Sequence, residues 1–212
     1  DLRERVTRQV ALPSSDYFIQ FGGQFESQRS ASRRIALLSL VSLAGMVAVL
    51  WSHFRSMAFT LQVLVNIPLA LIGAVVAVAI TGGVFSIASL VGFITLTGIA
   101  ARNTIMMLAH YQHLVFHEGE RVDAAMVIRG STERLIPVLM TALTAGLSLI
   151  PLAFAAGEPG KEILHPVAVV ILGGLVSSTL LDIVLTPAVF WRFGRPALER
   201  MAEERAAQIR PE

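Results

Sequence analysis

Cysteine is absent from the sequence, and charged residues are scarce. The lack of cysteine excludes disulfide bonds and thiolate-bound metal ions. Asp, Glu, Lys and Arg together make up 15% of the residues, well below the roughly 25% that is usual for a soluble domain. The net charge of +2 is too small to indicate a nucleic-acid partner. The composition therefore excludes an ordinary soluble domain and indicates a membrane protein.

Long apolar runs take the place of the missing charges. Hydrophobic residues make up 54% of the chain, and the mean hydropathy is +0.67. A helix needs about 20 apolar residues to cross the hydrocarbon core of a bilayer. The apolar runs predict an all-α membrane protein with five transmembrane helices. The predicted spans are residues 35–51, 57–80, 84–116, 135–156 and 163–193.

Both ends of the chain are polar. Residues 17–21 (YFIQF) alternate like a β-strand and end at two glycines, which is typical of a soluble domain. We therefore interpret residues 1–34 as the end of a soluble domain followed by a short helix on the membrane surface. The predicted membrane domain is residues 35–193, and residues 194–212 form a charged tail. The longest polar loop is predicted at residues 117–133.

Arginine placement predicts the orientation of the spans. Arginines are concentrated in residues 117–134 and in the tail from Arg192. The turns on the opposite side contain one basic residue, Lys161. Loops on the cytoplasmic side of membrane proteins carry an excess of Arg and Lys. We therefore expect the arginine-rich loop and the tail to be cytoplasmic, with the turns at residues 81–83 and 157–162 on the outside.

One charge, Arg102, interrupts the span at residues 84–116. Placing an arginine at the centre of a membrane helix costs at least roughly 2.5–3.5 kcal/mol, so such residues usually face a bundle interior and a partner. Alternatively, Arg102 marks the end of the helix, and its long side chain extends to the lipid headgroups. The interior position is favoured because the apolar pattern continues for several turns after Arg102.

A stripe of small residues leads to Asp182, the charge in the middle of the last span. Gly174, Ser178 and Asp182 follow one another at intervals of four, and Gly173 and Ser177 widen the same face. Small residues at this spacing let helices approach closely. We therefore expect these four small residues to be packing contacts, and Asp182 to point toward a neighbouring helix and not toward lipid.

Two further stripes lie on the third and fourth spans. Thr95, Gly98 and Arg102 share a helical face, with Gly98 as a predicted packing contact. Arg134 and Thr141 are seven residues apart and also share a face. These stripes predict that small and polar side chains lie on the same helical faces as the charged residues, next to Arg102 inside the membrane.

Met106, His110, His113 and His117 form one more stripe on the third span. Thioether and imidazole groups are suitable ligands for copper or zinc. Met106, His110 and His113 are therefore candidate metal ligands. Alternatively, the histidines mark a helix end in the headgroup region, where imidazole is well solvated.

Three runs of the sequence resemble one family of transporters. They are GIAARNTIMMLAHY, ERLIPVLMTALTAGLSLIPLAF and HPVAVVILGGLVSSTLLDIVLTPAVF, and they occur in the order in which the family has them. From about residue 17 to residue 193, the chain resembles the C-terminal membrane part of resistance–nodulation–division efflux pumps. Its last two helices are most similar to the heavy-metal, or cation, efflux branch. The resemblance implies that the chain is a fragment equivalent to helices eight to twelve of such a pump, with residues 1–34 as the end of a periplasmic domain and its membrane-surface helix.

The resemblance implies a proton-driven efflux permease of the bacterial inner membrane. Pumps of this family are homotrimers that exchange protons for substrate and join a periplasmic adaptor and an outer-membrane channel. Protons would be the coupling ion, no cofactor is implied, and the exported substrate would be a metal cation or a small toxic compound. Membrane lipid would surround the helices, and no nucleic acid would take part.

The resemblance also implies roles for individual residues. Arg102 and Asn103 match a basic residue and an asparagine on the family's tenth helix, where the basic residue pairs with aspartates of another helix in a proton relay. Thr141 matches a relay threonine, and Arg134 matches a basic residue at the cytoplasmic end of the same helix. Asp182 is a further relay candidate, although it is not part of the general family motif.

Two other classes of protein are alternatives to a transporter. A family-like scaffold that holds partners together without transporting anything has the same membrane composition. A membrane enzyme would need an acid–base pair, and the candidates are His165 and Asp182. These two residues lie about 25 Å apart along one helix, which excludes their cooperation within one chain.

Overall fold

The computed structural model describes residues 24–82 and 85–209. Contacts divide the chain into two units, Asp1–Leu40 and Val41–Glu212, which we describe separately. The described part of the first unit is the beginning of helix α2 (Gln24–Phe54).

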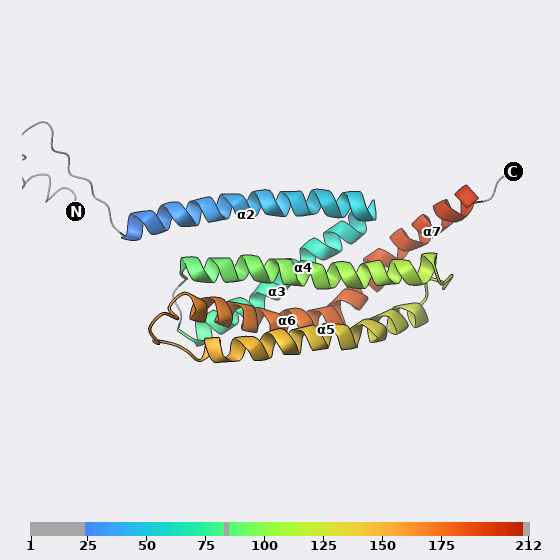
Figure 1. The fold of residues 1–212 in the computed structure, drawn as a ribbon. Helices are drawn as coiled ribbons and strands as arrows, with labels where there is room; N and C mark the ends of the chain where they lie inside the picture. Colours follow the sequence, from blue (N-terminus) through green and yellow to red (C-terminus); the bar gives the residue numbers. More distant parts are fainter. Residues whose placement is uncertain (1–23, 83–84, 210–212) are drawn as a thin grey trace, which may run out of the picture. The chain divides into compact units, whose positions relative to one another are not determined.

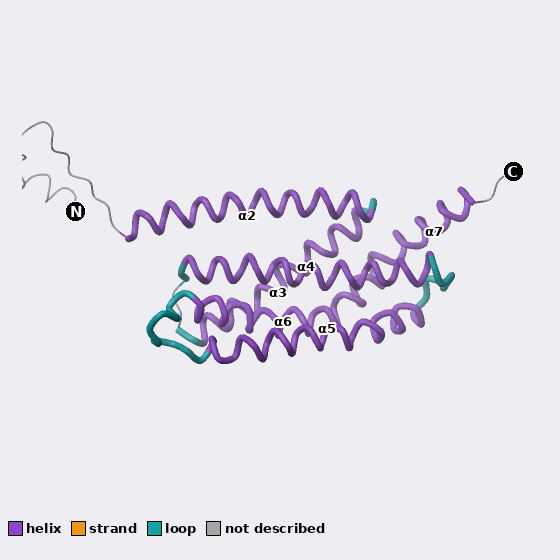
Figure 2. The backbone as a smooth tube through the Cα atoms, viewed as in Figure 1, coloured by secondary structure: helices purple, strands orange, loops and turns teal. Residues whose placement is uncertain are grey.

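The second unit consists of long helices joined by short connections (Figure 1). The described residues contain no strand, as the tube in Figure 2 also shows. The predicted strand at residues 17–21 lies outside the described residues. After α2 the elements are α3 (Met57–Ile80), α4 (Ile87–Phe116), α5 (Ala124–Ala153), α6 (Leu164–Val189), the π-helical turn η1 (Phe190–Gly194) and α7 (Arg195–Ile209).

Within residues 24–82 and 85–209, five helices are long and apolar enough to cross a membrane. The prediction of an all-α membrane protein with five such helices is therefore confirmed. The bounds of the helices differ from the predicted spans. Residues 24–34, predicted as a separate surface helix, continue without a break into the first span within α2. The third span begins as a helix only at Ile87, where the Ser86 hydroxyl accepts a hydrogen bond from the Ser89 backbone N–H.

The polar loop after α4 is shorter than predicted. Helix α5 begins at Ala124, so the loop extends only from residue 117 to residue 123. A carboxylate oxygen of Asp123 accepts a hydrogen bond of 2.8 Å from the backbone N–H of Met126 and caps the helix. The prediction of a loop as far as residue 133 was wrong because this helix starts outside the apolar run.

Arg129 ties this loop to the first turns of α5. Its guanidinium donates to Glu118 at 2.7 Å, to Glu133 at 2.8 Å, and to Glu120. Glu133 also lies 2.7 Å from an imidazole nitrogen of His110 on α4. The network therefore joins α4, the loop and α5. It pairs the charged side chains of Arg129 and Glu133 in the first turns of α5, so this polar stretch can be part of the helix.

The charged tail continues α6 as a helix through η1 and α7. Phe190 is fully buried at this junction. Its ring centroid lies 4.4 Å from that of Tyr111 on α4 and 6.0 Å from that of Phe59 on α3. These aromatic rings form the core at the end of the unit next to the loop 117–123.

Helices α3 and α6 approach each other along small residues. A Cβ atom added to Gly173 would lie 2.3 Å from the Cβ of Ala77 and 2.7 Å from the backbone oxygen of Gly73. The hydroxyl of Ser177 donates a hydrogen bond of 2.7 Å to the backbone oxygen of Ala70. The close approach therefore depends on the absence of a side chain at Gly173.

Helix α4 meets α6 at Gly174. A Cβ atom there would lie 1.9 Å from a methyl carbon of Leu96, a fully buried residue. Ser178 is buried one turn later.

Gly98 was predicted to be a packing contact, but it is exposed and nothing lies within 4 Å of a Cβ atom built on it. Among the described residues, Gly98 is therefore not a helix-packing contact.

Candidate functional site

The four predicted relay residues line one hollow between α4 and α5. Arg102 and Asn103 approach it from α4, and Arg134 and Thr141 approach it from α5. The hollow has a volume of about 220 Å³. Asn103 is buried, Arg134 is half-buried, and Arg102 and Thr141 are exposed. The fold thus brings together residues that are up to 39 positions apart in the sequence (141 minus 102).

Neither arginine of this hollow forms an ion pair within the described residues. The hydroxyl of Thr141 donates to the backbone oxygen of Val138 in its own helix, at 2.9 Å. Arg102 and Met106, one helical turn later, are both exposed. Two positive charges therefore stand at a hollow of α4 and α5 without a carboxylate from the described helices.

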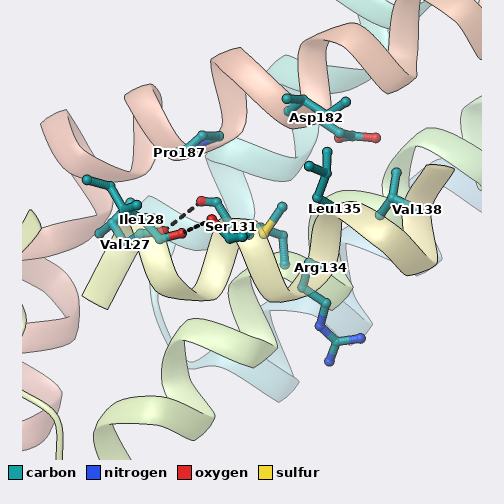
Figure 3. Close-up of a pocket in the computed structure, with 11 residues that line it drawn as sticks. Val127, Ile128, Ser131, Arg134, Leu135, Val138, Asp182 and Pro187 are labelled. Carbon is teal, nitrogen blue, oxygen red and sulfur yellow. Dashed lines mark hydrogen bonds between the residues drawn. The ribbon is translucent and has the colours of Figure 1, made fainter. Parts of the chain in front are cut away.

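A second hollow of about 300 Å³ adjoins the first and contains Asp182. The two hollows share Met107, Arg134 and Val138. In Figure 3, Leu135 and Val138 of α5 lie on the side of Asp182, whereas the guanidinium of Arg134 points away from it. Asp182 and Arg134 thus line the same hollow without forming an ion pair.

Asp182 is the centre of a buried polar network between α3, α4 and α6. Its Oδ1 atom accepts hydrogen bonds from the hydroxyls of Thr104 at 3.3 Å and Thr186 at 3.4 Å. The amide nitrogen of Asn66 donates to both of these hydroxyls, at 2.8 and 2.7 Å. The amide nitrogen of Gln62 donates to the backbone oxygen of Thr186 at 2.8 Å. All five residues are less than 9% exposed.

Three oxygen atoms of this network have no hydrogen-bond partner among the described residues. They are Oδ2 of Asp182, Oδ1 of Asn66 and Oε1 of Gln62. A buried polar atom without a partner costs about 1–3 kcal/mol. Such a cost at three neighbouring side chains indicates a site with a role beyond packing.

Sequence reasoning found Asp182 and missed the side chains around it. Gln62 and Asn66 are one helical turn apart in an otherwise apolar stretch, which was a usable signal. Thr186 follows Asp182 at the same interval of four. Thr104 had no such signal, because a single threonine in a membrane helix most often bonds to its own backbone.

The candidate metal ligands do not converge. Among the described residues, no group of three or more His, Cys, Asp or Glu side chains could hold a metal ion. The rings of His110 and His113 stack at 6.4 Å, and His110 bonds to Glu133. Met106 is 47% exposed on α4. His110 and His113 instead lie near carboxylates at the end of α4, Glu133 at 2.7 Å and Glu118 at 3.9 Å.

Comparisons with known proteins point to one group. Residues 1–194 match the sequence model of the AcrB/AcrD/AcrF family. The nickel and cobalt resistance protein CnrA of Cupriavidus metallidurans is 39% identical over 189 residues, which are 89% of this chain and 17% of that protein. The multidrug resistance protein MdtC of Escherichia coli is 30% identical over 192 residues, which are 91% of this chain and 18% of that protein.

A solved structure has the same arrangement of helices. The crystal structure of a heavy metal efflux pump superposes with a TM-score of 0.72 and 38% sequence identity, over 91% of this chain and 19% of that one. The chain thus spans about a fifth of the length of the proteins that it matches. The fold of the described helices is that of one part of such a pump.

Proposed function

Because the chain belongs to the AcrB/AcrD/AcrF family of resistance–nodulation–division permeases, we propose that it is part of a proton-driven efflux permease that exports metal cations. The gathering of Arg102, Asn103, Arg134 and Thr141 around one hollow supports this function most directly. A metal cargo is supported by the higher identity to a nickel and cobalt resistance protein, 39%, than to a multidrug resistance protein, 30%. Small toxic compounds are the alternative cargo.

The proposed role of Arg102 follows from the chemistry of its guanidinium. An arginine stays charged at all physiological pH values, so Arg102 would act by pairing with a carboxylate and not by releasing a proton. The side chain is exposed on the described helices, where a carboxylate of the longer protein can approach it. An ion pair in a medium of low dielectric constant is strong, and protonation of the carboxylate would remove it.

Release of Arg102 would couple the proton to the helices. Asn103 and Thr141 line the same hollow and offer acceptor oxygens to the freed guanidinium. Arg134, in the same hollow, would keep the local potential positive and disfavour the arrival of a second cation. A local change of charge partners of this kind can shift the balance between two packing arrangements of helices.

The proposed setting is the bacterial inner membrane. The permease would work as a homotrimer with a periplasmic adaptor and an outer-membrane channel, surrounded by lipid. The loop 117–123 and helix α7 would lie in the cytoplasm, because arginines are concentrated there. Transport would need no cofactor besides the coupling protons.

The orientation can be tested by cysteine labelling, for which the lack of native cysteine in this chain is convenient. Glu162→Cys, in the turn before α6, should react with a membrane-impermeant maleimide added outside the cells. Arg121→Cys, in the loop after α4, should react only after permeabilisation. Both side chains are exposed, so accessibility differs only by the side of the membrane. The reverse pattern of labelling would overturn the proposed orientation.

Export can be tested with the full-length permease in proteoliposomes that contain a pH-sensitive dye. Adding nickel or cobalt under an imposed proton gradient should produce a change of internal pH that is lost with Arg102→Ala. A pH change caused by organic compounds but not by metal ions would contradict the metal cargo. If neither kind of compound moved protons, a scaffold without transport activity would replace the proposed function.

A further inference from the structure

We propose that Asp182 is a second proton-binding site of this protein, which carries its proton on Oδ2 and exchanges it through the hollow lined by Ser131, Thr132 and Arg134. The inference deepens the proposed function, since it adds a titrating group on α6 to the relay at Arg102. It rests on a count of hydrogen-bond donors, on charge, and on the place of Asp182 in the hollow.

The donors of the network are all directed at one oxygen of the carboxyl group. The amide of Asn66 uses both of its hydrogens on the hydroxyls of Thr104 and Thr186. Each hydroxyl can then turn its own hydrogen toward Oδ1 of Asp182. Thr104 can also donate to the backbone oxygen of Ala100, at 3.2 Å. This arrangement is that of a carboxylic acid whose carbonyl oxygen is Oδ1.

The other oxygen, Oδ2, meets no donor among the described residues. An ionised carboxylate at this place would keep part of its charge on an atom that is buried and unpaired. Burial of an unpaired charge is far more costly than burial of a neutral group, so the side chain takes up a proton instead. A proton on Oδ2 removes the charge and leaves the two bonds to Oδ1 in place.

The groups that face Asp182 from the described residues of α3, α4 and α5 offer it no close counter-charge. Helix α3 presents the amides of Gln62 and Asn66. Helix α4 presents Asn103 and Thr104, and the Tyr111 hydroxyl reaches the same hollow through its bond of 2.6 Å to Ser131. Helix α5 presents Arg134, whose guanidinium points away from Asp182 (Figure 3). The bundle therefore favours the neutral acid.

The hollow supplies a path for the proton. It is lined by Asp182 together with Ser131 and Thr132, whose hydroxyls donate to backbone oxygens of their own helix, at 2.7 and 2.8 Å. Under the proposal, water that accepts no hydrogen from these hydroxyls but donates to their oxygens would carry the proton between the aqueous phase and Asp182. Asp182 is 18 residues from the start of α6 at Leu164 (182 minus 164), which is about 27 Å along the helix. It therefore lies closer to the end of the bundle that carries the loop 117–123 than to the opposite end. In the proposed orientation, Asp182 would exchange its proton with the cytoplasm.

Loss of the proton has a consequence for helix packing. The new charge on Oδ2 requires a donor. Asn103 of α4 faces Asp182 and is one candidate, whereas Asn66 can supply a donor only by giving up a bond to Thr104 or Thr186. These bonds join α3 to α4 and α3 to α6. Recruitment of Asn66 by the deprotonated Asp182 would therefore loosen the contact of α3 with either α4 or α6, which is a means of coupling the proton to a conformational change.

Infrared spectroscopy of the full-length protein at neutral pH tests the inference without measuring transport. A detergent without ester groups keeps the carbonyl region clear. The wild-type spectrum should contain the C=O stretching band of a protonated carboxylic acid that is missing from the spectrum of Asp182→Asn. This variant has nearly the same shape, and a near-identical amide band would show that it is folded. Equal spectra of the two proteins in the carboxylic-acid region would overturn the proposal.

A matched pair of threonine variants tests the arrangement of the donors. Thr104→Val removes one donor to Oδ1 and should shift the Asp182 band to higher frequency. Thr144→Val is the control, since its hydroxyl is exposed and bonds to the backbone oxygen of Met140 in its own helix. An unshifted band in Thr104→Val, or the same shift in both variants, would contradict protonation on Oδ2. The band does not depend on export, so failure of the proposed function would leave this result unchanged.

Discussion

Replacing Arg102 by alanine is expected to abolish export by the full-length permease. The side chain is one of two positive charges in the hollow between α4 and α5. Without its guanidinium, protonation of a partner carboxylate has no ion pair to break, and the proton no longer acts on the helices. Arg102→Lys should retain part of the activity, because it keeps a positive charge but loses the planar fork of donors.

The loss of export in Arg102→Ala should not come from misfolding. Alanine is easier to insert into a membrane than arginine, by roughly 2.5–3.5 kcal/mol at the centre of a helix. The measurement is metal resistance or export at matched abundance of the protein in the membrane. Arg121→Ala is the control, since Arg121 lies exposed in the loop 117–123, outside both hollows. Wild-type export by Arg102→Ala would show that Arg102 is only an interfacial arginine.

The second large effect is expected from a single methyl group between α3 and α6. Gly173→Ala places a Cβ atom 2.3 Å from the Cβ of Ala77 and 2.7 Å from the backbone oxygen of Gly73. The backbone oxygen cannot move aside as the end of a flexible side chain can, so the two helices must separate. Overpacking of this kind costs about 1–3 kcal/mol of folding free energy. The separation would also strain the hydrogen bond between Ser177 and Ala70.

Thermal unfolding of the full-length protein in detergent measures this effect. The control is Gly146→Ala on α5, where the added Cβ atom would lie 3.9 Å from Leu172 and Leu175, an ordinary contact. Gly173→Ala should lower the unfolding temperature, and Gly146→Ala should leave it unchanged or raise it slightly. Equal unfolding temperatures for the two variants would show that α3 and α6 do not meet at Gly173.

Part of the candidate site could be predicted from the sequence. Arg102, Asn103, Arg134 and Thr141 were predicted from a resemblance of sequence runs, and the fold places all four at one hollow. Asp182 was expected to point toward a neighbouring helix, and its carboxyl group bonds to Thr104 of α4. The orientation of Asp182 could be predicted because an apolar chain in a membrane can hold a charge only where other helices surround it. The relay role of the four residues at the hollow stays a prediction.

Other features could not be predicted, because they depend on which helix faces which. Gln62 and Asn66 join the network of Asp182 only because α3 packs against α6 along Gly73 and Gly173. Gly98, like Gly173, belongs to a stripe of small residues along one helical face, but its face of α4 is exposed. A pattern of small residues shows that a close contact is possible and does not show where the second helix is.

The sequence by itself determined that the chain is an all-α membrane protein with five long apolar helices. Length and hydropathy suffice for this, because a backbone in lipid must satisfy its hydrogen bonds within each helix. Only the tertiary structure decided that three helices enclose Asp182, that two adjoining hollows share Arg134, and that the oxygen Oδ2 has no partner among the described residues. These features arise from distances between side chains more than 70 positions apart, as for Thr104 and Asp182 (182 minus 104). Local periodicity carries no information about such distances, since they are set by the depth to which each pair of helices can interdigitate.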